Sequence, residues 1–334
     1  MPDEDRLIRR ITRAIPSFAG AEGAKSGALL GIADDAALIK PPRAQLWVVT
    51  VDAFIEGVHF WGDKHPPESV GYKALARATS DIAAMGAVPR FFLLTLALPK
   101  SRTGVWLDRM LRGMGKAARS LGLTLVGGDT TQSPSVSMSI TVIGESAGEI
   151  VTRAGAKPGD LIYVSGPLGC AQLGLELVRR GLARDRRWHT LLEAHLHPRI
   201  RTKLGLWLAQ HNVASAMMDI SDGLSSDLSR LCAASGVGAR ICVDRIPRDQ
   251  IPMELAKRLR RRSGDTLDLA LHGGDDYELL FTVPKQRSER LKAAPGSSDL
   301  RAIGEIRSGR RISLVSAGGQ AQELKPSGWD SFRR

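Results

Sequence analysis

The sequence predicts a two-domain protein of the α+β or α/β class, and three observations lead to that prediction. The chain has 334 residues, more than one typical domain needs. Strand-like apolar segments are interspersed with amphipathic helical segments, without a regular βαβ repeat. Gly, Lys and Pro gather in "GEIVTRAGAKPGD" at 148–160. We therefore expect a mixed α/β domain over 1–148 and an α/β sandwich domain over 149–334.

The first domain is expected to mix strands and helices. In order, we expect a strand at 46–54, a helix at 66–87, a strand at 90–99, a helix at 103–122, and strands at 123–131 and 135–145. Prolines open the first helix, and a glycine lies at or near the end of each helix. The segment "LTLVGGDTT" predicts a short strand that runs into a glycine turn.

The second domain restarts with "LIYVSG". After it we expect a helix at 168–181, charged helices within 185–210, a strand at 239–244, a helix ending in "KRLRRRSGD", and strands near Ile303 and Ile312. The basic run at 257–265 lies at the end of that helix, where cations favour the helix dipole. No aromatic residues interleave with it, so binding of a nucleic acid is the weaker interpretation of the net charge of +12.

The composition predicts a cytoplasmic protein. No apolar run approaches the ~18 residues that span a bilayer, and the N-terminus does not resemble a secretory signal. The three cysteines, Cys170, Cys232 and Cys242, show no metal-ligand spacing and are expected to be reduced thiols. A positive chain attracts anionic small molecules such as nucleotides, and we expect neither a membrane nor a nucleic-acid partner.

Acidic residues recur where apolar segments end. The sites are Asp34 and Asp35, Thr50 and Asp52, Asp129, Asp219 and Asp222, and Asp275 and Asp276. Each site alone has an ordinary explanation, because Asp and Gly are common turn residues. Five such sites beside strands are harder to dismiss, and we expect their side chains to converge along one rim.

Asp81 lies inside the Ala-rich helix "ALARATSDIAAMG", where an unpaired carboxylate is costly. One interpretation pairs it with Arg77, four residues earlier. The other places a metal ion between this helix and the Asp-bearing loops. The helix alone does not decide between them.

Oxygen ligands without His or Cys suit Mg²⁺ or Mn²⁺ and not zinc, and Mg²⁺ bridges carboxylates and phosphates. Several such carboxylates around a polyphosphate are what phosphoryl transfer needs. The sequence contains no P-loop. Instead, "GGDTT" and "DISDG" are expected to offer backbone N–H groups to phosphate, with Ser221 and Asp222 opening a helix.

Seven ordered motifs resemble the thiamine-monophosphate kinase family, within the superfamily of aminoimidazole ribonucleotide synthetase. They are "GIADDAAL", "TVDAFIEGVHF", "YKALARATSDIAAMGAVP", "GGDTT", "TRAGAKPGD", "DISDGLSSDL" and "GGDDYELLFTVP". The resemblance covers the chain from about residue 4 onward. It implies ATP- and Mg²⁺-dependent phosphorylation of thiamine phosphate to thiamine diphosphate by direct in-line transfer. It also implies a homodimer joined through the N-terminal sheets.

The resemblance also assigns roles to residues. The implied Mg²⁺ positions, with more than one ion, are Asp35, Thr50, Val51, Asp52, Asp81, Asp129, Asp219 and Asp222. The implied ATP site is Gly128, Asp129, Arg153 and Ser221, and the implied thiamine phosphate contacts are His59, Asp275 and Trp329. Asp222, Asp129 and Arg153 are the implied catalytic residues. From the residues alone, His59 reads as a satisfied histidine and Trp329 as a packing anchor.

The chain departs from the family pattern at three positions. Asp275 stands where Glu is usual, Ala33 where Gly is usual, and Val51 where Thr or Ser is common. Two related activities remain alternatives. A selenophosphate-synthetase-like role needs a reactive Cys near the N-terminus, whereas the first is Cys170. An aminoimidazole-ribonucleotide-synthetase-like role keeps the fold but lacks the thiamine-directed residues.

Overall fold

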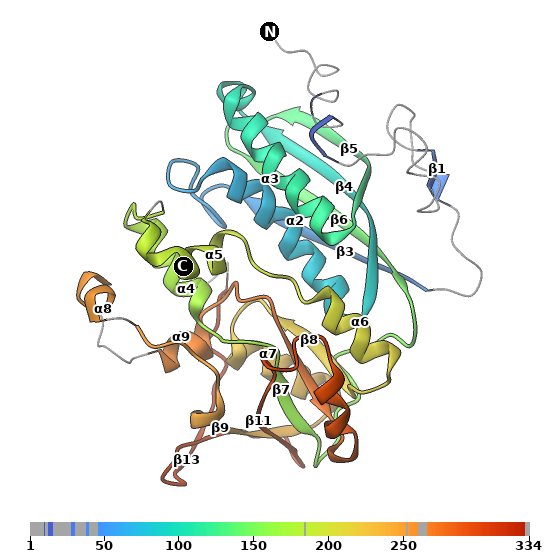
Figure 1. Ribbon diagram of the computed structural model, residues 1–334, viewed down its shortest axis with the longest axis vertical. Helices are drawn as coiled ribbons and strands as arrows, with labels where there is room; N and C mark the ends of the chain where they lie inside the picture. The colour runs from blue at the N-terminus through green and yellow to red at the C-terminus, as the bar shows by residue number, and fades with distance from the viewer. Residues whose placement is uncertain are drawn as a thin grey trace. The chain divides into compact units, whose positions relative to one another are not determined.

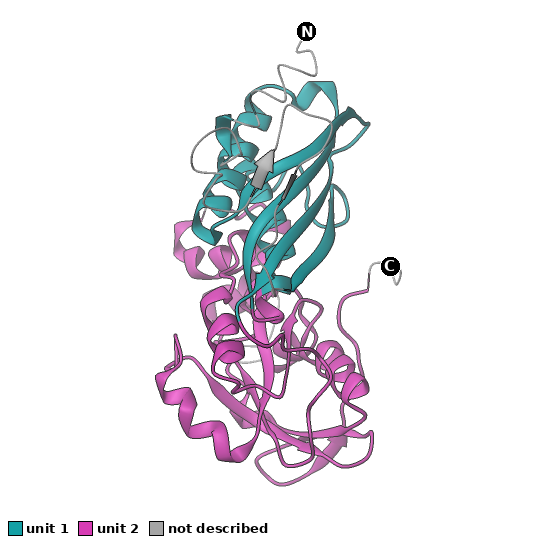
Figure 2. Ribbon diagram, turned by 90° about the vertical axis from the view of Figure 1, so that its right-hand side faces the viewer, with its two compact units in different colours: residues 1–82, 87–147 teal, residues 83–86, 148–334 magenta. Residues whose placement is uncertain are grey.

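The computed structural model describes residues 10, 13–15, 28–30, 38–39, 46–183, 185–251, 253–259 and 266–330. The chain divides into two compact units, coloured separately in Figure 2. Unit 1 comprises residues 1–82 and 87–147, and unit 2 comprises residues 83–86 and 148–334. A short antiparallel pair, β1 (Ala28–Leu30) and β2 (Leu38–Ile39), precedes the main sheet of unit 1.

Unit 1 is built on a four-stranded sheet with the strand order β3-β6-β4-β5. Its strands are β3 (Trp47–Ile55), β4 (Ala87–Leu98), β5 (Thr124–Gln132) and β6 (Ser137–Ser146). β6 is antiparallel to both of its neighbours, whereas β4 and β5 are parallel and joined through α3 (Val105–Leu121). α3 and α2 (Pro67–Ala84) lie on one face of this sheet (Figures 1 and 2).

On the opposite face of this sheet, called the open face below, several of the described side chains are exposed. Val49 and Val51 of β3 are 62% and 63% exposed, and Thr95 of β4 is also exposed. Phe54, two residues beyond Asp52 on the same strand, points to the helix side and is buried. The alternation of strand side chains thus gives β3 one face toward α2 and one apolar face toward solvent.

Unit 2 is built on a seven-stranded sheet with the order β13-β12-β9-β11-β7-β10-β8. The strands are β7 (Leu161–Val164), β8 (Ala216–Ile220), β9 (Gly238–Cys242), β10 (Glu278–Val283), β11 (Arg301–Arg307), β12 (Ile312–Val315) and β13 (Ala321–Glu323). Most neighbours are antiparallel, and only β9 and β12 pair in parallel. The expected strands near Ile303 and Ile312 are β11 and β12.

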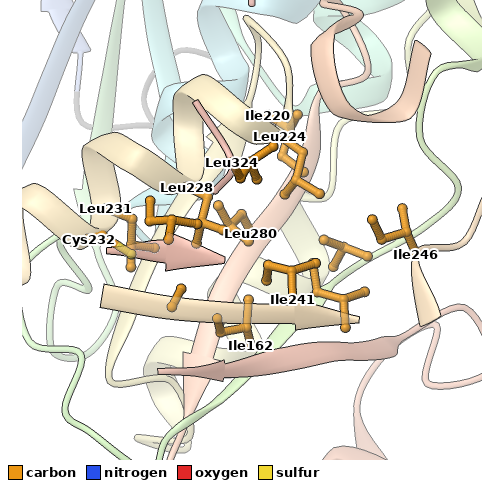
Figure 3. Close-up of a cluster of buried hydrophobic side chains, with 14 of the residues drawn as sticks. Ile162, Ile220, Leu224, Leu228, Leu231, Cys232, Ile241, Ile246, Leu280 and Leu324 are labelled. Carbon is orange, nitrogen blue, oxygen red and sulfur yellow. The ribbon is translucent and has the colours of Figure 1, made fainter. Parts of the chain in front are cut away.

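The helices of unit 2 cover both faces of its sheet. They are α4 (Cys170–Arg179), α5 (His189–Leu196), α6 (Thr202–Gln210), α7 (Leu224–Ser235), α8 (Met253–Leu259) and α9 (Leu267–His272). Figure 3 shows Leu228 and Leu231 of α7 among the buried side chains of β7, β9 and β10. Leu204 and Leu208 of α6 pack with Phe281 on the other face.

The fold class predicted from sequence is confirmed, and several element bounds are corrected. "GGDTT" is not a turn but part of β5, which continues to Gln132. The helix expected at 168–181 is shorter because left-handed glycines flank it, Gly169 at its N-cap and Gly181 beyond its end. The Arg-rich run begins in α8, and its residues 260–265 lie outside the described ones.

Candidate active site

Two polar side chains of β3 pair with two residues of α2. The Thr50 hydroxyl donates to Asp81 Oδ2 at 2.6 Å. The Arg77 guanidinium donates twice to Asp52, at 2.7 and 3.1 Å. Thr50 and Asp52 share one face of the strand because they are two residues apart, and Arg77 and Asp81 share one face of the helix because they are four apart. The strand and the helix therefore meet through two adjacent polar pairs.

These contacts bear on the two interpretations of Asp81. Arg77 makes a two-bond ion pair with Asp52, and its guanidinium also lies 5.5 Å from the Phe54 ring. Asp81 accepts from the neutral Thr50 hydroxyl, so its negative charge is not offset by that contact. The arrangement leaves a half-buried carboxylate and a hydroxyl oxygen side by side, a donor set that suits a hard cation.

Gly128 and Asp129 are part of the strand β5, where the backbone of β4 approaches too closely for a side chain at position 128. A side chain on Gly128 would bring its Cβ within 1.9 Å of the Leu94 carbonyl oxygen, and the φ of +156° favours glycine. An extra residue in β5 shifts the register between Phe92 and Leu93. Asp129 is exposed, and its carboxylate accepts the Thr130 N–H at 2.9 Å. The glycines therefore serve strand pairing and not a turn.

The acids of unit 1 do not all converge within this unit. The register aligns Asp129 with Thr95, Ser139 and Ala53 across the sheet, whereas Asp52 lies in the neighbouring row. Asp129 thus belongs to the open face and Asp52 to the helix face. Their strands are the two edges of the sheet, three strand spacings or roughly 14 Å apart. The expected single rim is wrong here because β5 runs on through the acidic segment instead of ending before it.

Other predicted residues of the first domain have simpler surroundings. The Val51 side chain lies on the open face, away from Thr50 and Asp52, and carries no donor atom for a metal. His59 follows β3; its Nδ1 accepts the Ile55 N–H at 3.0 Å and its ring stacks on Phe54. Ala33, Asp34 and Asp35 lie outside the described residues.

In unit 2 the loop after β8 is organised by a buried carboxylate. Asp227 Oδ2 accepts three successive backbone N–H groups, and Asp227 itself is 0% exposed. The donors are Ser221, Asp222 and Gly223, at 3.1, 3.0 and 3.1 Å. The expectation that Ser221 and Asp222 open a helix with exposed N–H groups is wrong, because these amides are occupied and α7 begins only at Leu224. Any nucleotide contact of Ser221 must therefore use its side chain or carbonyl.

Arg230 links this buried carboxylate to the predicted metal residue. Its Nη1 lies 2.6 Å from Asp222 Oδ2 and 2.6 Å from Asp227 Oδ1. Burial and the neighbouring Asp222 charge raise the pKa of Asp227 to about 6, and Arg230 acts in the opposite direction. Asp219 lies on β8 and is 4% exposed; it shares a strand face with Met217, opposite to Met218 and Ile220.

The three acids of the segment "GGDDYE", Asp275, Asp276 and Glu278, each make different contacts. Asp275 has a left-handed φ of +71°, and its carboxylate accepts the Tyr277 hydroxyl at 2.9 Å. The buried His195 has Nδ1 3.7 Å from the other Asp275 oxygen. Two groups therefore fix the direction of the side chain that the family resemblance places at thiamine phosphate.

The two remaining acids of this segment are structural. Asp276 accepts the N–H groups of Gly169 and Ala171 at the start of α4, and burial raises its pKa to about 8. Glu278 makes two hydrogen bonds with Arg201, both 2.7 Å long. Both acids hold the base of the loop that carries Asp275.

The last two predicted residues are partly exposed. Arg153 is exposed, and Ser235 donates to its backbone carbonyl at 2.9 Å. The preceding carbonyl of Thr152 accepts the Met217 N–H, which fixes this segment beside β8. Trp329 is 41% exposed. The backbone N–H of Trp329 donates to the Asp222 carbonyl at 2.8 Å. The backbone of Trp329 is thus attached to the 219–223 segment, whereas Arg153 lies beside the start of β8 and the end of α7.

The oxygen-rich donor set fits Mg²⁺ better than a transition metal. Over the described ranges, however, no group of three or more His, Cys, Asp or Glu side chains is placed to hold a metal ion. Magnesium normally takes only one or two protein carboxylates and completes its shell with water and phosphate. The Asp81–Thr50 pair fits that requirement. In the same described part of the chain, no helix is long and apolar enough to cross a membrane.

The fold places the chain in a class of proteins, the AIR synthase related proteins. Family models of AIR synthase related proteins match the chain, the N-terminal domain at 33–146 and the C-terminal domain at 157–316. The chain is 37% identical to thiamine-monophosphate kinase of Salmonella typhimurium over 299 residues, 85% of this chain and 89% of that protein. It is 33% identical to the Bacillus subtilis enzyme of that name over 315 residues, 91% and 94% of the two chains. The chain belongs to the thiamine-monophosphate kinase family.

Solved structures agree with this assignment. Thiamine-monophosphate kinase from Stenotrophomonas maltophilia K279a matches with a TM-score of 0.79 and 35% identity, over 95% of this chain and 96% of that one. A structure described as AaThiL complexed with AMPPCP and TMP matches with a TM-score of 0.75 and 30% identity, over 98% and 96%.

Sequence reasoning missed the residues that hold the predicted ones in place. Asp227 was visible as a third acid in "DISDGLSSDL", and Arg230 follows it at the helix spacing of three. These two signals could have indicated an ion pair. No local pattern pointed to His195, which lies about 80 residues before the Asp275 carboxylate that it approaches.

Proposed function

We propose that this protein transfers the terminal phosphoryl group of ATP to thiamine phosphate, which yields thiamine diphosphate. The observation that carries the proposal is the fixed Asp275 carboxylate beside an exposed Trp329 in a chain of this family. A carboxylate and an aromatic face suit a cationic aromatic ring such as that of thiamine. The acceptor is already a phosphate, so the reaction needs positioning and charge neutralisation more than a strong base.

We propose that Thr50, Asp52 and Asp81 hold Mg²⁺, and that more than one ion binds. Asp35, Asp129, Asp219 and Asp222 are proposed as further Mg²⁺ ligands. When bound, the metal would neutralise charge on the phosphates. Arg153, which is exposed, is proposed to contact the nucleotide with Gly128, Asp129 and Ser221. His59 is proposed to contact the acceptor phosphate.

We propose that the functional domains are residues 1–148 and 149–334, close to the bounds of the two units, and that the chain is a cytoplasmic homodimer. Support for the dimer comes from unit 1. Among the described residues β3 and β5 each pair on one side only, and the open face carries Val49 and Val51. Support for the cytoplasm comes from three free cysteines, Cys170, Cys232 and Cys242.

One assay tests the proposed reaction. ATP consumption is measured with Mg²⁺ and either thiamine phosphate, free thiamine or no acceptor. We expect turnover with thiamine phosphate and only background with the other two, because an ionised phosphate acceptor needs no general base, whereas the hydroxyl of free thiamine does. Comparable turnover with free thiamine, or ATP hydrolysis that ignores the acceptor, would contradict the proposal. Removal of Mg²⁺ with EDTA should abolish the reaction.

A further inference from the structure

The segment 326–330 lies along the start of α7 and is attached by its backbone. Three successive N–H groups of the segment donate to residues of the loop and the first helical turn. The pairs are Ser327 to Ser225 Oγ at 3.3 Å, Gly328 to Ser226 Oγ at 2.9 Å, and Trp329 to the Asp222 carbonyl at 2.8 Å. The two serines of "DGLSSDL" therefore bind a segment about 100 residues further along the chain.

The fit of this segment is close at Gly328. A Cβ on Gly328 would lie 2.0 Å from the Asp222 carbonyl oxygen and 2.6 Å from Ser226 Oγ. Contacts this short are excluded for real atoms, and the carbonyl cannot move without the loop. Only glycine therefore allows the backbone to lie against the start of α7.

Ser225 is itself held rigidly. It is 0% exposed, and its hydroxyl also lies 2.8 Å from His272 Nδ1. The side chain thus connects α9, α7 and the 326–330 segment. A buried hydroxyl with two such neighbours has one allowed orientation, so the segment is attached to a fixed point.

The attachment brings Trp329 beside Asp275. The Ser221 carbonyl accepts the Asp275 N–H at 2.8 Å, and the next carbonyl in the chain, that of Asp222, accepts the Trp329 N–H. A Cβ on Gly274 would lie 3.6 Å from Trp329 Cβ, which is ordinary contact distance. Successive carbonyls of one loop therefore hold the backbones of both residues.

A packing role explains Trp329 less well. Its side chain is 41% exposed, whereas a packing anchor would bury the ring. Ser327, Gly328 and Trp329 are attached through their backbone N–H groups, and the indole ring of Trp329 is left partly exposed. This pattern suits an aromatic surface that is kept in place for a ligand.

We propose that Ser225 and Ser226 are positioning residues, which fix Trp329 next to Asp275 and thereby set the affinity for the aromatic acceptor. The proposal rests on the proposed function, because it takes thiamine phosphate as the molecule that meets Trp329. Neither serine touches the substrate. Their effect is confined to the acceptor because the segment they hold carries no nucleotide-directed residue.

Steady-state kinetics test the role. Ser226→Ala should raise the KM for thiamine phosphate roughly three- to tenfold, the size expected for one lost hydrogen bond, without changing kcat or the KM for ATP. Gly328→Ala should raise it further, because the whole segment must lift. Ser226→Thr keeps the acceptor oxygen and should retain the wild-type KM. Ser288→Ala, at a partly exposed serine whose hydroxyl donates to the Lys285 carbonyl, is the matched control.

Hydrogen exchange of the backbone amides tests the attachment independently of activity. The Gly328 amide should exchange faster in Ser226→Ala than in wild type, with the sheet amides unchanged. If wild type is inactive on thiamine phosphate, the proposed function fails, and this exchange still decides the attachment. Unchanged exchange in Ser226→Ala overturns the attachment. Faster exchange with an unchanged KM in an active enzyme overturns the positioning role.

Discussion

Adjacent residues in this protein make different contacts and have different roles. In the segment 275–278, Asp275 accepts the Tyr277 hydroxyl, Asp276 accepts N–H groups at the start of α4, and Glu278 pairs with Arg201. The left-handed φ values of Asp275 and Tyr277 make this possible, because they break the alternation that a strand would impose. Such φ values cost energy in residues other than glycine, which indicates that the direction of Asp275 matters to the site.

At this scale the shorter acid at position 275 gives a prediction. Asp275→Glu should keep the fold and lower the KM for thiamine phosphate by roughly three- to tenfold, a change of about one hydrogen bond in free energy. The added methylene moves the carboxylate beyond the Tyr277 hydroxyl and toward the acceptor. Steady-state kinetics at saturating ATP measure the change.

Tyr277→Phe provides the matching control, because it removes only the hydroxyl. It should alter the KM when Asp275 is present and have little further effect together with Asp275→Glu, and a double-mutant cycle measures that coupling. If Asp275→Glu leaves both KM and kcat unchanged, the side chain does not contact the acceptor.

Among the elements, β10 and the segment before α6 are joined by an ion pair that is nearly buried. Arg201 and Glu278 are each 10% exposed in their side chains, and Ser165 also donates to Glu278. Two parallel hydrogen bonds give this pair a fixed geometry. It secures the start of β10, and therefore the base of the 273–277 loop.

Removing one partner of this pair should be costly. Arg201→Met is expected to lower the free energy of unfolding by about 3–5 kcal/mol, because it leaves Glu278 buried without its main cation. Urea denaturation measures the loss. The control is Arg307→Met, whose exposed pair with Glu305 should cost at most about 1 kcal/mol. If both variants lose the same free energy of unfolding, burial does not make the Arg201–Glu278 pair more important for stability than an exposed pair.

The long elements were predictable and the irregular ones were not. α2 and α3 lie close to the predicted 66–87 and 103–122, because prolines and glycines mark their ends. β5 was misjudged, since Gly128 looks like a turn residue when the Leu94 carbonyl that requires it is invisible in the sequence. The same limit applies to the site: the motifs named the candidate residues, but the Thr50–Asp81 and Arg230–Asp222 contacts depend on pairing between distant segments.

At the scale of the whole molecule, the open face of unit 1 is the feature that needs a partner. A sheet with two unpaired edges among the described residues and exposed valines on one face is prone to associate. The proposed homodimer would cover that face.

A charge on this face should prevent association. Val51→Asp is expected to give a folded monomer, because an Asp buried in an apolar interface lacks a partner. Light scattering coupled to size exclusion measures the mass, and circular dichroism checks the fold. Val105→Asp, at a valine 73% exposed at the start of α3, is the control and should remain dimeric. A monomeric wild type, or a dimeric Val51→Asp, would contradict the proposed interface.

The three amides that meet on one oxygen of Asp227 also restrict how this segment can change in length. A single residue inserted between Gly223 and Asp227 would rotate the carboxylate by about 100° around the axis of α7 and carry it away from all three donors. Substitutions at the surface of the loop leave that helical phase intact, whereas insertions and deletions do not. Surface side chains of the loop and of the first turn of α7 can therefore vary during evolution, but the number of residues between the three amides and Asp227 must stay the same.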